Sequence, residues 1–284
     1  MDYTNCTLCP RECSVDRTSG SVGFCRCPDT ALVAKAMLHK WEEPVLAKNA
    51  SGAIFFGGCT LGCSYCQNRA ISRHPAGTPM DARLLRQTME DLIAQGAENI
   101  DLVTPTQFLP TVLKALEEKL SVPVIYNCGG YEKPETIRAL AGKIDIFLPD
   151  MKYADNSLSF ALSGASDYFE VAAAGISAMV DIVGPVQYRE DKLVKGVIVR
   201  HLILPGHVEN SLKVLDFLGE RFAPGEILVS LMRQYTPMPG MPAPLDRTVT
   251  EEEYQAVLSW MYLNGLQGFT QERASAASDF IPDF

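Results

Sequence analysis

Long apolar runs, basic charge and an export signal are what this 284-residue sequence lacks. Its longest apolar stretch, Val171 to Val180, is interrupted by Gly175 and Ser177 and is too short to span a bilayer. The 25 lysines and arginines are outnumbered by 34 acidic residues, so the net charge of −9 argues against a nucleic acid or anionic membrane partner. The first residues, MDYTNCTLCPREC, have neither the basic nor the apolar segment of a signal peptide. We therefore expect a cytoplasmic protein.

Cysteine, in contrast, is abundant. Nine cysteines in a short exported chain would indicate a disulfide scaffold, but this chain is long and its cysteines are clustered. Clustered cysteines in such a chain indicate metal or redox chemistry. The two groups are Cys6, Cys9, Cys13, Cys25 and Cys27, and then Cys59, Cys63 and Cys66, while Cys128 stands apart.

The second group has the spacing CxxxCxxC within GGCTLGCSYCQN. Its three thiolates lie on one short loop, and the adjoining glycines let the backbone curl around a bulky inorganic centre. An iron–sulfur cube normally takes four cysteine ligands, so three ligands leave one iron open for chemistry. The alternatives are a structural zinc completed by a distant histidine or cysteine, and reduced thiols in the core.

The first group supplies four ligands for a closed site. Cys6, Cys9, Cys13 and Cys25 are enough for a tetrahedral structural zinc or for a four-cysteine iron–sulfur cluster. A metal would stabilise an extension too small to hold a core alone. Paired or free thiols are the third alternative, and Cys27 is spare in each case. For Cys128 we weigh a reactive thiol against a buried, inert one.

The rest of the sequence alternates apolar strands with amphipathic helices, which is typical of a parallel βα array. Helix signals include Asp81 before a run that ends at Gly96, Pro110 in a first turn, and a capping box formed by Thr250 and Glu253. Six βα units are too few for a closed eight-stranded barrel. We therefore predict an α/β fold, a partial (βα)6 TIM-type barrel over residues 51–284 with a C-terminal helix, preceded by a cysteine-rich metal-binding extension over residues 1–50. The strands are predicted near 53–57, 99–104, 122–127, 144–149, 197–203 and 226–232.

The loop FFGGCTLGCSYCQN has the signature CxxxCx-aromatic-C, in which Tyr65 is the aromatic residue. In this signature the chain resembles the radical S-adenosylmethionine (SAM) superfamily. Over nearly its whole length it resembles pyruvate formate-lyase activating enzyme-like proteins with a cysteine-rich N-terminus. Supporting stretches are AMLHKWEEP at 36–44, NIDLVTPTQF at 99–108, YNCGGY at 126–131, LPDMKY at 148–153, RHLILPGH at 200–207 and SLMRQYTP at 230–237.

The resemblance implies an oxidoreductase in which Cys59, Cys63 and Cys66 hold a [4Fe-4S] cluster whose open iron binds SAM. Reductive cleavage of SAM gives a 5′-deoxyadenosyl radical that abstracts a hydrogen atom from a substrate. The implied partners are a reductant protein such as flavodoxin or ferredoxin and a glycyl radical enzyme that the chain activates. Two alternatives stay open, a radical modification of a small molecule or peptide and a non-catalytic iron–sulfur redox protein.

Candidate cofactor-binding residues follow the predicted strands, because ligands of parallel βα folds gather at the carboxyl ends of the strands. Asp150 and Lys152 match the Asp-x-Lys of the activating enzymes, and Arg200 is suited to a carboxylate. Each candidate also has a structural alternative, namely a plain turn, a solvated ion pair or an arginine paired with a neighbouring acid. The full set is Tyr65, Thr104, Thr106, Gln107, Asn127, Gly129, Gly130, Asp150, Lys152 and Arg200.

Two stretches depart from the resembled pattern. Asn127 stands where the activating enzymes have the aspartate of Asp-Thr-Asn-Gly, and residues 104–107 read Thr-Pro-Thr-Gln where many members have Gly-Gly-Glu. The threonine or glutamine oxygens would serve as acceptors for the SAM amino group, or the stretch is a proline turn without ligand contact. Two roles are open for the polar side chains of HKWEEP: they would face the active site or, as we favour, tether the N-terminal extension by hydrogen bonds. These residues are His39, Glu42 and Glu43.

Overall fold

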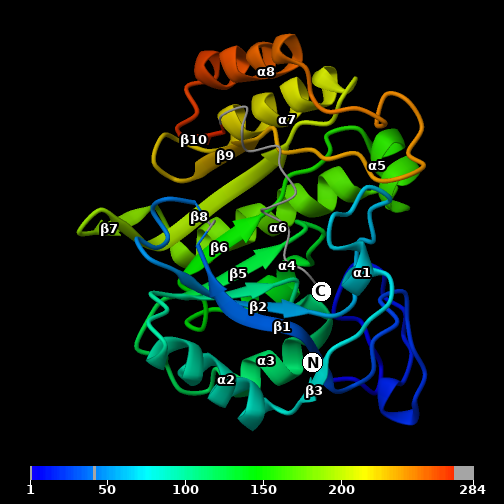
Figure 1. The fold of residues 1–284 in the computed structure, drawn as a ribbon, viewed down its shortest axis with the longest axis vertical. Coiled ribbons are helices and arrows are strands. Elements are labelled where there is room, and N and C mark those ends of the chain that lie inside the picture. The colour runs from blue at the N-terminus through cyan, green and yellow to red at the C-terminus, as the bar shows by residue number, and fades with distance from the viewer. Residues whose placement is uncertain (1, 41–42, 272–284) are drawn as a thin grey trace.

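The computed structural model describes residues 2–40 and 43–271, and its main feature is one mixed sheet (Figure 1). The strand order is β10-β9-β8-β6-β5-β4-β2-β1-β3. From β2 to β10 every neighbouring pair is parallel, whereas β1 and β3 are antiparallel to their neighbours. The predicted α/β fold with a mostly parallel sheet, a partial barrel of the TIM type, is therefore confirmed.

All six predicted strands are present. They are β2 (Ser51–Phe56), β4 (Ile100–Val103), β5 (Val124–Cys128), β6 (Ile146–Pro149), β8 (Lys192–Leu202) and β9 (Leu228–Met232). Along the chain, each of these strands lies next to the previous one, always on the same side of it. At least one helix connects each strand to the next, as in other parallel βα folds. The helices are α1 (Arg69–Ser72), α2 (Ala82–Ala94), α3 (Leu109–Ala115), α4 (Pro134–Arg138), α5 (Asn156–Ser163), α6 (Tyr168–Val183), α7 (Val208–Arg221) and α8 (Glu251–Leu263).

The predicted helix signals form as expected. The Asp81 carboxylate caps α2 by accepting the backbone N–H of Leu84, and α3 carries its proline in the first turn. Thr250 and Glu253 form both bonds of the capping box at the start of α8. These local rules fix where the helices begin, while apolar side chains such as Leu85 and Val112 pack them onto the sheet.

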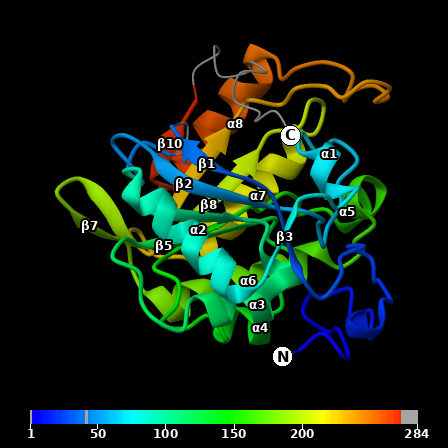
Figure 2. The same ribbon diagram turned by 60° about the horizontal axis from the view of Figure 1, so that its bottom comes forward.

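Four strands were not predicted. They are β1 (Ala31–His39), β3 (Thr78–Met80), β7 (Gln187–Arg189) and β10 (Gly268–Thr270). β1 pairs with β2 over most of its length, so part of the expected extension is a strand of the main sheet. The segment before it holds five cysteines in irregular loops and the single turn η1 (Arg17–Ser19), and lies beside the sheet, drawn in dark blue in Figure 2.

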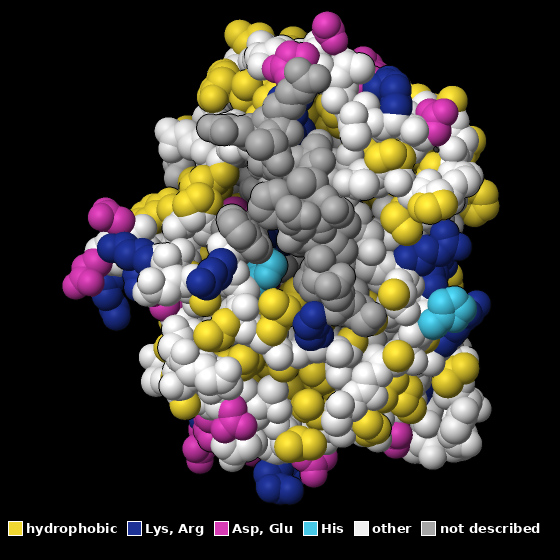
Figure 3. Space-filling model, viewed as in Figure 1, with side chains coloured by type: hydrophobic (Ala, Val, Ile, Leu, Met, Phe, Trp, Pro, Cys, Tyr) yellow, Lys and Arg dark blue, Asp and Glu magenta, His cyan; other side chains and the backbone are white. Residues whose placement is uncertain are grey.

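Among residues 2–40 and 43–271, none of the helices is both long and apolar enough to cross a bilayer. On the face in Figure 3, acidic and basic side chains are interspersed and neither sign dominates.

Candidate functional site

A hollow of about 920 Å³ lies at the carboxyl ends of the parallel strands. Its size falls in the upper part of the range for small-molecule sites, which is about 300–1,000 Å³. The cysteine loop after β2 forms one part of its wall, and residues at the ends of β4, β5, β6, β8 and β9 form the rest. Of the predicted site residues, it is lined by Cys59, Cys63, Cys66, Tyr65, Thr104, Asn127, Gly129, Asp150, Lys152 and Arg200.

The cysteine loop brings its three sulfurs to this one hollow. The backbone N–H groups of Leu61 and Gly62 each donate to the Cys59 Sγ at 3.4 Å, and the Ser72 hydroxyl donates to the Cys66 Sγ at 3.5 Å. Gly62 adopts a φ of +67°, which lets the loop turn back between the first two cysteines. Donors that point at sulfur stabilise it as a thiolate, the form that binds metal.

The electrostatics of the three sulfurs favour a shared cation. Burial, together with the nearby sulfurs of Cys63 and Cys66, raises the pKa of Cys59 to about 12. The thiol therefore keeps its proton unless a metal displaces it. A set of three cysteines on one loop at the wall of an open hollow fits an iron–sulfur cluster with one iron facing the space where a ligand would lie.

Asp150 and Lys152 form an ion pair at the end of β6, with Nζ and Oδ2 2.5 Å apart. Burial lowers the pKa of Lys152, but the charges of Asp150 and Cys63 outweigh it and hold that pKa above its ordinary value. The ammonium group therefore stays charged beside the cysteine loop. Gly129 lies between the Lys152 side chain and the cysteine loop. A Cβ placed there would contact Leu61 of the loop at 3.6 Å and Lys152 Cε at 3.8 Å.

Gly130 has a structural reason to be glycine. It adopts a φ of +79°, and a Cβ there would lie 1.9 Å from the Asp150 carbonyl oxygen. The Tyr168 hydroxyl ties the same region together, since it contacts the carbonyl oxygens of Gly129 and Asp150 at 2.9 Å and accepts the backbone N–H of Lys152. Gly130 does not line the hollow, so it shapes the β5 and β6 ends instead.

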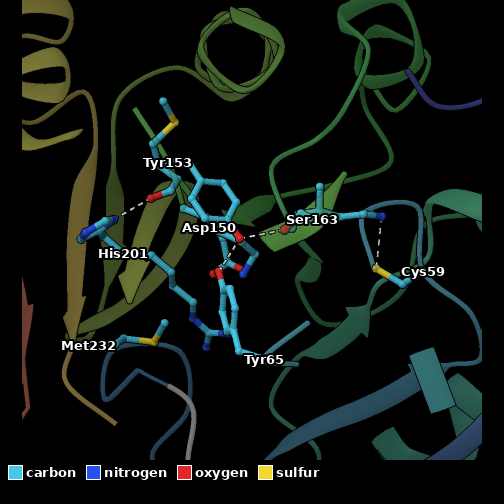
Figure 4. A network of polar contacts seen from close by, with 12 residues as sticks. Cys59, Tyr65, Asp150, Tyr153, Ser163, His201 and Met232 are labelled. Carbon is cyan, nitrogen blue, oxygen red and sulfur yellow. Dashed lines mark hydrogen bonds and ion pairs between the residues drawn. The ribbon is translucent and has the colours of Figure 1, made fainter. Parts of the chain in front are cut away.

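The Tyr65 hydroxyl belongs to a chain of three hydroxyl groups, those of Tyr65, Tyr153 and Ser163 (Figure 4). The Tyr153 hydroxyl donates to the Tyr65 hydroxyl at 2.8 Å and lies 2.7 Å from the Ser163 hydroxyl. Figure 4 also shows His201, whose Nδ1 lies 2.6 Å from the Met151 carbonyl oxygen. Tyr65, which lies between Cys63 and Cys66 in the sequence and lines the hollow, is thereby hydrogen-bonded through its hydroxyl to the interior.

Residues 104–107 divide between the hollow and the interior. Thr104 lines the hollow and has a φ of +58°, a strained conformation for a β-branched residue. The Thr106 hydroxyl donates to Glu132 at 2.7 Å, and the Gln107 amide donates to the carbonyl oxygens of Gly57 and Thr104. Thr106 and Gln107 are buried and do not line the large hollow, so their side chains face the protein interior.

Asn127 bonds to an acid that the sequence interpretation did not single out. Its amide nitrogen donates to the Oδ2 of Asp101, which is fully buried in the neighbouring strand β4. A carboxylate thus lies beside the position where the resembled activating enzymes carry an aspartate. The signal was present in the sequence, because an aspartate within the apolar run NIDLV has no ordinary structural reason to be there.

Arg200 forms a bidentate pair with Glu43, with both N–O distances 2.7 Å. Burial would raise the pKa of Glu43, but the Arg200 guanidinium outweighs it and holds that pKa below its ordinary value. Glu43 thereby tethers the segment after β1 to β8, as favoured above. The bidentate edge of the Arg200 guanidinium binds Glu43. His39 lines the hollow, and Glu42 lies outside the described residues.

The four N-terminal cysteines gather at a second, smaller hollow. Cys6, Cys9, Cys13 and Cys25 line it together with Arg17, Phe24, Thr60 and Gln107. Cys27 lies outside it and donates its thiol proton toward the carbonyl oxygens of Cys25 and Gly57. Cys128 is buried, lines the large hollow, and has its pKa raised well above the ordinary value by burial.

Comparison with known proteins agrees with this geometry. A model of the Radical SAM superfamily matches residues 53–218. An uncharacterised protein of Methanocaldococcus jannaschii is 29% identical over 252 residues, which cover 83% of this chain and 67% of that protein.

The fold is also similar to solved structures. A radical SAM methyltransferase from Sphaerobacter thermophilus has a TM-score of 0.55 at 14% identity, covering 78% of this chain and 66% of that one. Streptococcus suis SuiB bound to S-adenosylmethionine has a TM-score of 0.52 at 14% identity, covering 78% of this chain and 50% of that one. The chain therefore spans half to two thirds of these two solved chains, and at this identity the likeness shows the fold alone.

Proposed function

Because the chain belongs to the radical SAM superfamily, we propose that it is an enzyme in which Cys59, Cys63 and Cys66 hold the family's [4Fe-4S] cluster next to SAM. Together these groups supply a 5′-deoxyadenosyl radical, formed with methionine when one electron cleaves the sulfonium, and this radical abstracts a hydrogen atom from the substrate. The observation that carries the proposal is the convergence of the three cysteines on a large hollow at the carboxyl edge of the sheet.

The chain's own residues bind and orient. The Lys152 ammonium, kept charged by Asp150, is suited to the carboxylate of a bound amino acid, and Gly129 leaves room for its approach. Thr104 and Asn127 offer oxygen atoms at the same edge for an ammonium group. Tyr65, whose hydroxyl accepts that of Tyr153, and the surrounding strand ends shield the reacting atoms from water.

For the substrate we propose a glycine residue of a partner protein, a glycyl radical enzyme, with flavodoxin or ferredoxin as the electron donor. The size of the hollow supports this assignment, since it has room for a backbone loop as well as a cofactor. Resemblance to the pyruvate formate-lyase activating enzymes over most of the chain points the same way.

Radical modification of a small molecule or peptide is the second candidate, and residues 104–107 and Asn127 favour it. Thr106 and Gln107 face the interior, and Asn127 takes its carboxylate partner from β4. The edge that binds the amino acid part of SAM is therefore built differently from that of the activating enzymes in the resemblance.

Cleavage of SAM tests the reaction. The anaerobically reconstituted chain, reduced and given SAM, is expected to release 5′-deoxyadenosine, and Cys63→Ala is expected to abolish this release. Cys27→Ala, a buried cysteine outside the large hollow, is the matched control. Equal rates for wild type and Cys63→Ala would contradict the proposal. A cluster whose spectrum ignores SAM would favour a non-catalytic redox protein.

Electron paramagnetic resonance separates the two substrate classes. A glycyl radical doublet on a co-expressed partner, dependent on SAM and on Cys63, would establish activation. Turnover of SAM with hydrogen abstraction from a small molecule or free peptide, and no doublet on any partner, would support the second candidate.

A further inference from the structure

The hollow between the N-terminal cysteines has the features of a second metal centre. Four sulfurs from a segment of only 20 residues, Cys6 to Cys25, line one small space. Backbone hydrogen bonds hold the residues on either side of Cys13 to the two earlier cysteines: the Ser14 N–H donates to the Cys6 carbonyl oxygen and the Glu12 N–H to that of Cys9. The Phe24 N–H donates to the Cys13 Sγ at 3.3 Å, as a thiolate ligand requires.

The backbone around these cysteines is strained. Glu12 and Ser14, on either side of Cys13, have φ values of 41° and 53°, and Arg26, after Cys25, has a φ of 58°. Each such conformation costs on the order of 1–3 kcal/mol and persists only where other interactions impose it. Binding of the sulfurs to a common centre would supply that interaction.

Arg17 is the second, independent observation. Its side chain is 1% exposed, and its guanidinium donates to the carbonyl oxygens of Cys27, Pro28 and Gln107. Its Nη1 also points at the Cys6 Sγ, 3.8 Å away. Within the part of the chain that the structure describes, no carboxylate lies at ion-pair distance from it. The carbonyl oxygens and the Tyr3 ring, 4.6 Å from the guanidinium carbon, stabilise this buried cation, and a thiolate-ligated metal centre in the hollow would add a negative charge beside it.

The arrangement of the sulfurs does not suit a single metal ion. Around zinc, four sulfurs would stand about 2.3 Å from the metal and leave no free space between them. Here the space has room for about one water molecule. Among the described residues, no group of three or more cysteine, histidine or acidic side chains converges on one ion position. Cys59, Cys63 and Cys66 do not converge on one ion position either, and in the radical SAM family such a set of cysteines holds a cluster and not a single ion.

We propose that Cys6, Cys9, Cys13 and Cys25 hold an auxiliary iron–sulfur cluster, with Arg17 neutralising part of its negative charge. The two centres would be neighbours, because Thr60 lines the small hollow and Cys59, the residue before it, lines the large one. Cys27 is not a ligand. The proposal is independent of the substrate and of SAM cleavage.

Metal analysis of the full-length chain tests it. The variant Cys59→Ala/Cys63→Ala/Cys66→Ala removes the ligands of the SAM-binding cluster and leaves the N-terminal segment intact. After anaerobic reconstitution it is expected to retain about four iron and four acid-labile sulfide per chain. Adding Cys9→Ala is expected to remove both, whereas adding Cys27→Ala, the matched control from the same segment, is expected to leave both in place.

Zinc without sulfide in the triple variant would overturn the proposal, and so would a triple variant with neither metal. Loss of the cluster on Cys27→Ala as well as on Cys9→Ala would show that a general loss of structure, not ligation, was measured. For a variant that fails to fold, Mössbauer spectra of the wild-type chain decide: two cluster populations support the proposal, and a single one contradicts it. The iron count in the triple variant does not depend on radical chemistry, so failure of the proposed function would leave it unchanged.

Discussion

Two buried side chains, His201 and Glu132, have shifted pKa values that make the stability depend on pH. His201 is fully buried between the Met151 carbonyl oxygen and the Ser211 hydroxyl, and burial lowers its pKa to about 4. Glu132 is equally buried, accepts the Thr106 hydroxyl, and has its pKa raised by burial to about 8. Both side chains are therefore neutral in the folded chain near pH 7, and they act on stability in opposite directions.

His201 is expected to destabilise the fold in acid. The unfolded chain binds the proton first, near the ordinary pKa of 6.5, so the stability is full above this pH and is lost as the pH falls through about 4. The slope is at most about 1.4 kcal/mol per pH unit. Urea unfolding of His201→Gln, which keeps a donor and an acceptor but does not titrate, should show a flatter profile between these pH values. The exposed His74→Gln serves as control, and an unchanged slope in His201→Gln would contradict the expectation.

Glu132 is expected to lower the stability as the pH rises from about 4.5 to about 8. Its folded pKa lies above the ordinary value of 4.5, so its contribution is full below that value and is lost as the pH rises through about 8. Glu132→Gln keeps an acceptor for Thr106 and should flatten the fall in unfolding free energy between about pH 4.5 and pH 8. Glu135→Gln, exposed on α4, is the matched control. The expectation is wrong if the two variants lose stability equally steeply.

At the scale of elements, α8 depends on its first turn. Thr250 accepts the N–H of Glu253, and the Glu253 carboxylate accepts the N–H groups of Thr250 and Gly206 and binds Arg247. Thr250→Ala is expected to lower the unfolding free energy by about 1 kcal/mol, the usual cost of a lost cap. Thermal unfolding against the exposed Thr248→Ala measures it. Equal melting temperatures for the two variants would show that the capping box contributes little.

Periodicity predicted the elements that local rules determine. The six central strands are rich in apolar residues, and α2, α3 and α8 carry their own capping or first-turn signals, so their existence followed from the sequence. β1 and β10 did not, because a strand whose place is set by a partner far along the chain, as β10 is by β9, has no strong local pattern.

In the candidate site, too, the residues set by local spacing could be predicted and those set by distant partners could not. The cysteine loop and the Asp150–Lys152 pair could be predicted from spacing, whereas the partner of Arg200 could not, since Glu43 lies 157 residues away in the sequence. Thr106 and Gln107 followed a strand as expected, but the turn η2 (Thr106–Phe108) directs them inward, and sequence spacing does not report such a direction.

At the scale of the whole molecule, Arg11 joins three distant segments. Its guanidinium donates to the carbonyl oxygens of Thr60 and Leu61 in the cysteine loop and of Ser163 and Gly164 at the end of α5, and it stacks on Phe24 at 3.9 Å. A lysine cannot reproduce this planar fork. Arg11→Lys is therefore expected to lower the unfolding free energy by about 1–3 kcal/mol.

Limited proteolysis of the N-terminal segment measures the same link directly. Cleavage before Ala31 should be faster in Arg11→Lys than in the wild type. Arg26→Lys, an exposed arginine of the same segment, should be cleaved at the wild-type rate, and no difference between the two variants would exclude the linking role.

The backbone from Cys59 to Leu61 has one hollow on each side, so the two proposed centres would share one short stretch of chain. A centre bound on one side would hold this stretch in place for the other, so filling of the N-terminal site should speed the loading of the second without being required for it. Loss of either centre to oxygen should likewise make the remaining one easier to extract with a chelator.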